Sequence, residues 1–145
     1  MVPYYVMISK AGLYDNILGI ALVYAGVNLP MSFMVIKGYM DTIPLELLES
    51  AQIDGATNGQ AFRRIILPVS KPGIVTACVF LVINSWNELL FANLLNQSDS
   101  SRTIQVAIRS FLTTFDANYA YAFAAMVISI LPTIIIYALL TDKII

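Results

Sequence analysis

Asn84, Asn87 and Glu88 are the residues whose types and spacing best suit chemistry, because they interrupt a long apolar stretch. On a helix, positions i, i+3 and i+4 lie on one face. A charged side chain at a membrane centre costs about 2.5 to 3.5 kcal/mol on insertion scales, so such residues usually face a bundle interior or a wet pathway. The chemistry indicated is hydrogen bonding, either to a polar solute or between helices. The alternatives for Glu88 are contact with water and an ion pair with an arginine of a partner helix.

The sequence offers no catalytic constellation and no metal site. Histidine, the commonest general base and metal ligand at neutral pH, is absent. Glu88 and Asp116 lie on different expected elements, so a membrane-embedded enzyme is the remote alternative. Gly55 and Gly59 are not followed by the Lys-Ser or Lys-Thr of a phosphate-binding loop. If ATP drives this protein, a separate subunit must bind it, and no cofactor is expected in this chain.

The composition is that of a membrane protein, with 59% hydrophobic and 12% charged residues, against about 25% charged in soluble proteins. A membrane-spanning helix needs about 20 apolar residues. Apolar stretches of this kind predict spans over residues 16–37, 72–95 and 122–140, the second on the condition that its helix continues past Glu88. We therefore expect an all-α, multi-pass membrane protein. A net charge of −1 and the lack of a basic run exclude a nucleic-acid partner.

The distribution of basic residues predicts the topology. The loop over residues 37–71 is the richer in lysine and arginine, and positive residues favour the cytoplasmic side. Its basic residues are Lys37, Arg63, Arg64 and Lys71, against Arg102 and Arg109 in the external loop over residues 96–121. This places the N-terminus outside without a signal peptide. Residues 2–8 are therefore expected to end a preceding span, and the chain is expected to be a fragment or truncated product.

The cytoplasmic loop, at about residues 41–71, reads as two short helices joined by a sharp turn. Pro44 suits the start of the first helix, and Gly55 suits its end, because glycine adopts positive φ without a Cβ clash. Thr57 and Gln60 have the spacing of a capping box, which predicts a second helix over about residues 58–66. Pro68 is expected to push Leu67 out of helical geometry. The apolar side of this bracket comprises Leu48, Ile53, Phe62, Ile65 and Ile66.

One spaced pattern runs through this loop. It consists of Glu49-Ser50-Ala51, then Asp54-Gly55, then Ile65-Ile66-Leu67-Pro68. It resembles the EAA loop of binding-protein-dependent ABC transporter permeases, with Ser50 as its one departure. Thr42-Ile43-Pro44 and Ser85-Trp86-Asn87-Glu88 resemble the carbohydrate branch of that family, of the maltose type. The resemblance covers nearly all of the chain.

This resemblance implies a MetI-like permease of about six spans, of which the chain would be the C-terminal half. It implies a multi-pass subunit of an ATP-driven importer of sugars or related polyols in the bacterial plasma membrane, and no enzyme. In such an importer the EAA loop couples closure of the ATPase to alternating access. The implied partners are a second permease, dimeric ABC ATPase subunits and an extracytoplasmic solute-binding protein. The residues it assigns to ATPase coupling are Glu49, Ser50, Ala51, Asp54, Gly55, Ile65, Leu67 and Pro68. Apart from the resemblance, the polar face formed by Asn84, Asn87 and Glu88 is expected either to line the translocation path or to hold helices around it.

Two features leave alternatives open. The apolar residues from Ile104 to Phe115 recur with a helical period, opposite Gln105, Arg109, Thr113 and Asp116. The resemblance implies that this amphipathic helix faces the solute-binding protein. The alternative is a helix that rests on lipid headgroups. Pro132 permits a kink, either a gating hinge or a fixed bend. The functional alternatives are a permease for amino acids, phosphate or metals, and a non-functional permease fragment.

Overall fold

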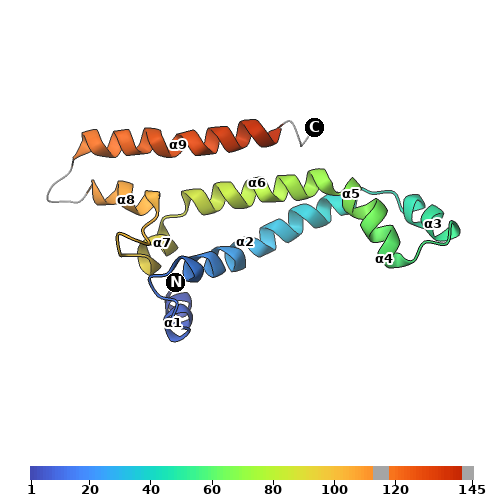
Figure 1. Cartoon of the computed structure of the whole chain (residues 1–145), viewed down its shortest axis with the longest axis horizontal. Coiled ribbons are helices and arrows are strands. Elements are labelled where there is room, and N and C mark those ends of the chain that lie inside the picture. The colour runs from blue at the N-terminus through green and yellow to red at the C-terminus, as the bar shows by residue number, and fades with distance from the viewer. Residues whose placement is uncertain (113–117, 142–145) are drawn as a thin grey trace. The chain divides into compact units, whose positions relative to one another are not determined.

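The structure, a computed structural model, describes residues 1–112 and 118–141, and every regular element in these ranges is a helix (Figure 1). The elements are α1 (Val2–Lys10), α2 (Ile17–Met40), α3 (Glu46–Ile53), α4 (Asn58–Ala61), the π-helical turn η1 (Phe62–Ile66), α5 (Leu67–Val69), α6 (Lys71–Asn87), α7 (Leu90–Leu95), α8 (Ile104–Ser110) and α9 (Tyr119–Thr141). The predicted all-α fold is confirmed.

The chain divides into two compact units. The first, here the Glu88 unit, comprises Met1–Asn28 and Val82–Ile136. The second, here the bracket unit, comprises Leu29–Leu81 and the end of α9 from Tyr137. The helices α2, α6 and α9 each contribute residues to both units.

Two described helices, α2 and α9, are each long and apolar enough to cross a membrane. Their apolar side chains are exposed on several sides, as Leu22 (59%) and Leu29 (64%) in α2 and Val127 (62%) and Ile128 (59%) in α9 illustrate. A helix that is hydrophobic all round is suited to lipid rather than to water. A third span is present if the bent pair Asn58–Val69 and Lys71–Asn87, which meet at 62°, counts as one.

The stretch expected to form one helix over residues 72–95 is divided. The helix α6 ends at Asn87, Glu88 and Leu89 are not helical, and α7 begins at Leu90. The physical reason is that the Glu88 carboxylate takes the backbone N–H groups of Phe91 and Ala92, which are free at the start of a new helix. A polar side chain in this stretch therefore starts a second helix.

The loop over residues 41–71 forms the expected pair of helical arms, with two differences. The first arm, α3, begins two residues after Pro44. The prediction that Leu67 leaves helical geometry is wrong, because Leu67 has φ −63° and ψ −45° and opens α5. Pro68 lies within one continuous helical stretch, Asn58–Val69, in which the wider hydrogen-bond pattern of a π-helix replaces that of the α-helix just before the proline. The π-helical turn η1 directly precedes α5.

After α7, the helix α8 is shorter than the expected amphipathic helix, and Thr113, Phe115 and Asp116 lie outside the described residues. Within α8 the buried side chains are Val106 and Ile108. Val106, which the helical pattern did not select, packs in one cluster with Ile20 and Ala92. This contact joins α8 to α2 and α7.

The helix α9 contains Pro132 and bonds to α6 beside it. Proline has no N–H, so the carbonyl of Ile128 four residues earlier loses its helical donor. At the next residue, the Trp86 Nε1–H donates to the Ser129 carbonyl over 3.0 Å. The indole therefore attaches α6 to α9 where the helical ladder is interrupted.

Candidate functional site: the coupling bracket and the α6–α7 break

The turn of the bracket is fixed by Gly55. Its φ is +81°, a conformation that side-chain-bearing residues rarely adopt. The Gly55 N–H donates to the Gln52 carbonyl over 3.0 Å, and the Ala56 N–H donates to the Ala51 carbonyl over 2.9 Å. These bonds satisfy carbonyls at the end of α3 and reverse the chain. The predicted helix stop at Gly55 is confirmed.

A capping box begins the second arm, as the sequence predicts. The Thr57 hydroxyl accepts from the Gln60 N–H over 3.4 Å, and the Gln60 Oε1 accepts from the Thr57 N–H over 2.9 Å. One further bond joins the arms, because the Gln52 side-chain amide donates to the Asn58 Oδ1 over 3.2 Å. The bracket is thus held by its turn, its cap and a polar link across it.

The two arms carry opposite charge. The acidic residues Glu46, Glu49 and Asp54 lie on or next to α3, and all are exposed. The basic residues Arg63 and Arg64 lie on η1 and are exposed as well. Within the described residues, no ion pair joins the two sets. Both sets are therefore available to a partner of complementary charge.

An apolar groove of about 490 Å³ lies on the bracket. Its lining residues are Met40, Ile43, Leu45, Leu48, Gln52, Asn58, Phe62 and Ile66. Leu45 is 71% exposed at its edge, and Phe62 is 46% exposed. Of the apolar side expected from the sequence, Leu48, Phe62 and Ile66 line the groove, whereas Ile53 projects outward at 87% exposure. The bracket thus presents an apolar surface with charges on both arms.

The residues expected to couple to an ATPase fall into exposed and inward positions. The exposed ones are Glu49, Ser50, Asp54, Gly55, Leu67 and Pro68. Ala51 is buried at 5% exposure, and Ile65 is half-buried. The small side chain of Ala51 therefore packs within the bracket, while its neighbour Ser50 donates its hydroxyl to the Leu47 carbonyl over 3.1 Å.

Glu88 lies at the break between α6 and α7, and its carboxylate has three hydrogen-bond donors. Its Oε1 accepts from the Phe91 N–H over 2.8 Å, and its Oε2 accepts from the Ala92 N–H over 3.0 Å. The Tyr24 hydroxyl of α2 donates to the same Oε2 over 2.9 Å. Bonds to an ionised acceptor are stronger than neutral ones. Among the described residues, the carboxylate is thus satisfied by three neutral donors, without a basic partner.

Asn84 and Asn87 lie on α6 and are both exposed, whereas Glu88 turns toward Tyr24. The expected single polar face of three residues is therefore reduced to the two asparagines. The Asn87 amide also donates to the Ile83 carbonyl over 2.9 Å. A third asparagine, Asn28 of α2, is 9% exposed and donates to the Tyr24 carbonyl over 2.8 Å.

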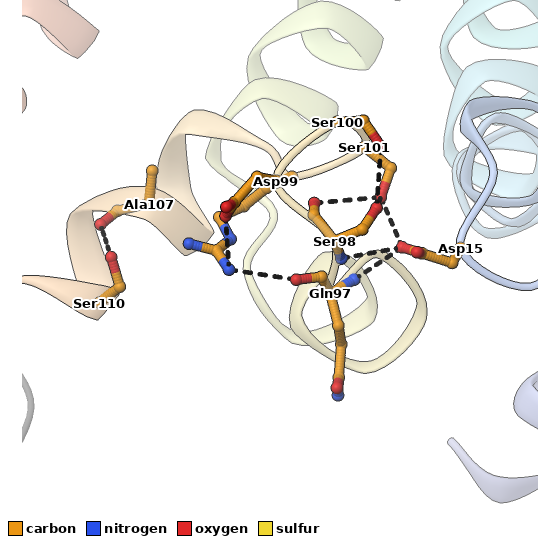
Figure 2. A network of polar contacts seen from close by, with 9 residues as sticks. Asp15, Gln97, Ser98, Asp99, Ser100, Ser101, Ala107 and Ser110 are labelled. Carbon is orange, nitrogen blue, oxygen red and sulfur yellow. Dashed lines mark hydrogen bonds and ion pairs between the residues drawn. The ribbon is translucent and has the colours of Figure 1, made fainter.

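A second carboxylate, Asp15, fastens the turn after α1 to the segment after α7 (Figure 2). Its Oδ1 accepts from the Gln97 N–H over 2.9 Å, the Ser98 N–H over 3.1 Å and the Ser101 hydroxyl over 2.5 Å. Asp15 has φ 55°, which aspartate tolerates better than most residues. The Ser101 hydroxyl bond, followed by bonds from Ser98 and Gln97, lowers the Asp15 pKa from 3.8 to about 2.

This shift predicts a pH dependence. A carboxylate whose pKa is lowered by folding stabilises the fold above its unfolded pKa of 3.8, and the effect is lost as the pH falls toward about 2. We expect the thermal midpoint of Asp15→Asn to fall less than that of the unmodified protein between about pH 6 and about pH 3. Asp99→Asn is the matched control, because the Asp99 side chain is 92% exposed. Equal slopes for Asp15→Asn and the unmodified protein would contradict the prediction.

Comparison with known proteins identifies the chain. Residues 1–144 match the family of binding-protein-dependent transport system inner membrane components. The chain belongs to this family. The resemblance that the spacing of the loop indicated is thereby confirmed: the chain is an inner membrane component of a binding-protein-dependent transport system, in a family of transport proteins and not of enzymes.

Individual members of the family are similar over nearly the whole chain. The chain is 32% identical over 143 residues to the diacetylchitobiose uptake system permease protein DasC of Streptomyces coelicolor, covering 99% of this chain and 52% of that protein. It is 34% identical over 134 residues to the trehalose transport system permease protein SugB of Mycobacterium tuberculosis, covering 91% and 48%. The chain thus spans about half the length of the curated relatives it matches.

A chain of a solved structure is also similar to this chain. The structure is the crystal structure of a bacterial ABC transporter involved in the import of the acidic polysaccharide alginate. The TM-score is 0.74 and the identity 25%, over 98% of this chain and 55% of that one. The fold is therefore shared with a chain of that transporter.

The sequence patterns did not single out two residues that form long-range hydrogen bonds in the structure. Tyr24 lies 64 positions from Glu88, and Asp15 lies 82 positions from Gln97. Asp15-Asn16 before an apolar run has the composition of a helix start, and this signal could have drawn attention to it. Tyr24 carries no comparable local signal, because an isolated tyrosine in an apolar span is compatible with plain packing.

Proposed function

We propose that the protein is a membrane-spanning permease subunit of an ATP-driven importer, and that its bracket couples ATPase closure to the spans. The observation that carries this proposal is the bracket itself: a glycine turn and a capping box hold two arms of opposite charge around an apolar groove. Such a surface suits a protein partner with a complementary cleft. The partner we propose is a dimer of ABC ATPase subunits, which binds the ATP.

The residues proposed for coupling are Glu49, Ser50, Ala51, Asp54, Gly55, Ile65, Leu67 and Pro68. In this proposal the exposed carboxylates of Glu49 and Asp54 contact the ATPase, and Gly55 sets the angle between the arms. The π-helical turn η1, with α5, then connects the second arm to α6, with a bend of 62° at Ser70. The bracket lies on the cytoplasmic side, and the Asp15 turn lies outside.

The proposed solute is a sugar. The relatives DasC and SugB are named for diacetylchitobiose and trehalose, and the similar solved transporter imports alginate. Exposed amides on a membrane helix suit hydroxyl-rich solutes, because an amide both donates and accepts hydrogen bonds. We assign the side chains of Asn84 and Asn87 to the translocation path. Glu88 contributes to the path by holding the neighbouring helices in place. A second permease would complete the path, and a solute-binding protein would deliver the sugar.

The test is purification from native membranes in mild detergent, followed by identification of every chain that comes with the protein. We expect a second permease and an ATPase, and sugar uptake by the assembly in proteoliposomes that requires ATP and a binding protein. Uptake of labelled amino acids or phosphate in place of sugars would overturn the solute class. Isolation without an ATPase, even after crosslinking from position 49, would overturn the proposed coupling.

A further inference from the structure

The short helix α7 is held at both ends by carboxylates. At its start, Glu88 accepts the N–H groups of Phe91 and Ala92. Just past its end, Asp15 accepts those of Gln97 and Ser98 (Figure 2). Hydrogen bonds to an ionised acceptor are about twice as strong as neutral ones. A helix of this length would be marginal alone, so these bonds contribute much of its stability.

Both carboxylates also connect α7 to the α1–α2 region. Glu88 binds the Tyr24 hydroxyl of α2 over 2.9 Å. Asp15, which lies in the turn between α1 and α2, donates its own N–H to the Leu95 carbonyl at the end of α7 over 2.9 Å. The polar contacts at the two ends of α7 therefore lead to the same neighbouring segment, residues 15–24.

Apolar packing fills the space between these polar contacts. Val23 of α2 is 4% exposed and belongs to one cluster with Ile8 and Leu95, which is 1% exposed. Ile20 of α2 is 6% exposed and packs with Ala92, which is fully buried. Separating α2 from α7 would expose these side chains, at about 25 cal/mol for each Å² of apolar surface. The contact between α2 and α7 is thus continuous from one end of α7 to the other.

The connection from α7 back to α6 is weaker. Glu88 and Leu89 interrupt the helix, and Leu89 has φ −112° and ψ −35°, outside regular helical values. The first backbone N–H groups of α7 bond to the Glu88 side chain instead of to carbonyls of α6. The helical pattern of backbone hydrogen bonds is therefore interrupted between α6 and α7.

We propose that Glu88 is a positioning residue, which fixes α7 to α2 so that the two move as one body while the chain bends at residues 88–89. The consequence of this arrangement for transport rests on the proposed function. During transport, the exposed asparagines of α6 can shift relative to α7 without disturbing the packing of α7 on α2. Glu88 then orders the wall of the path and does not contact the solute.

A disulfide tests whether α2 and α7 move together. Val23→Cys with Leu95→Cys, in a Cys78→Ser background, places two thiols in one buried cluster. In the assembled transporter we expect oxidation to leave uptake within about twofold of the reduced form, because one body has no internal motion to block. Loss of uptake on oxidation, restored by reductant, would overturn the proposal. If this pair does not assemble, Ile20→Cys with Ala92→Cys tests the same contact.

Kinetics separate a positioning residue from a solute ligand. For Glu88→Gln we expect the maximal uptake rate to fall about tenfold with an unchanged KM, because the glutamine loses one acceptor but no solute contact. Asn87→Ala is the matched comparison, and its KM for the sugar should rise. A raised KM for Glu88→Gln would overturn the positioning role.

Hydrogen exchange gives a readout that does not depend on transport. In the assembled protein, amide exchange in residues 91–92 should quicken about tenfold or more in Glu88→Ala, because both amides lose their acceptor. In Tyr24→Phe these amides should stay protected, since Glu88 still accepts them. Unchanged exchange in Glu88→Ala would overturn the proposed fixing of α7. Should the unmodified transporter fail to take up sugar, the proposed function falls, and the exchange result still decides the role of Glu88.

Discussion

Replacing Gly73 by alanine is expected to prevent α2 and α6 from packing in the bracket unit. A Cβ atom at this position would lie 2.6 Å from both Cβ and Cγ of Tyr39. Neither the new Cβ nor the Tyr39 Cβ can rotate away, so the helices must move apart. Overpacking typically costs 1–3 kcal/mol, and we expect about 3 kcal/mol here. The measurement is the thermal midpoint of the assembled protein in detergent, together with the yield of monodisperse material.

The neighbouring Gly38→Ala is the control for this substitution. It lies beside Tyr39 on the same helix, but a Cβ there meets nothing within 4 Å. We expect Gly38→Ala to be neutral or slightly stabilising, because alanine favours a helix over glycine by about 1 kcal/mol. The exchanged pair Gly73→Ala with Tyr39→Gly should recover part of the lost stability. A thermal midpoint for Gly73→Ala equal to that of the control would mean that the two helices do not approach closely here.

Substitutions of Gly55 are expected to reduce coupled transport in an order set by backbone conformation. The φ of +81° costs a residue with a side chain about 1–2 kcal/mol, and a β-branched residue more. Asparagine tolerates this conformation best, so the expected order of activity is Gly and Asn, then Ala, then Val. For Gly55→Val we expect at least a tenfold loss, roughly the effect of 1.4 kcal/mol. The readouts are ATP-dependent sugar uptake and the amount of ATPase that co-purifies.

Gly59→Ala controls for general sensitivity of the bracket. This glycine lies in α4 without positive φ, and a Cβ there meets nothing within 4 Å. Since a Cβ at Gly55 also meets nothing within 4 Å among the described residues, we attribute any loss to the backbone or to the partner. If Gly55→Asn is as damaging as Gly55→Val, close approach of the ATPase is the cause, and the conformational explanation is wrong.

Local patterns in the sequence were sufficient to predict much of the structure of the bracket. The positive φ of Gly55 and the reciprocal bonds of Thr57 and Gln60 depend on neighbouring residues, so their spacing predicts them. The spans follow similarly from long apolar stretches in α2 and α9. The prediction that Leu67 leaves helical geometry before Pro68 failed, because Leu67 keeps helical backbone angles directly after the π-helical turn η1.

The parts that could not be predicted depend on contacts between distant segments. The break at Glu88 requires a carboxylate that captures two backbone amides and is itself held by Tyr24, 64 positions away. A hydropathy pattern carries no information on such a pairing. Likewise, Val106 is buried because α8 lies against Ile20 and Ala92, and not because of its own helical period.

The bond from Trp86 to the Ser129 carbonyl can be followed by the intrinsic fluorescence of the chain. Trp86 is the single tryptophan of the chain, and its indole N–H is engaged by the α9 backbone at 3.0 Å. Indole emission shifts when this donor passes from a carbonyl to water. In a transporter whose other subunits lack tryptophan, the wavelength of the emission maximum during turnover would report whether α6 stays bound to α9. No attached dye would be needed.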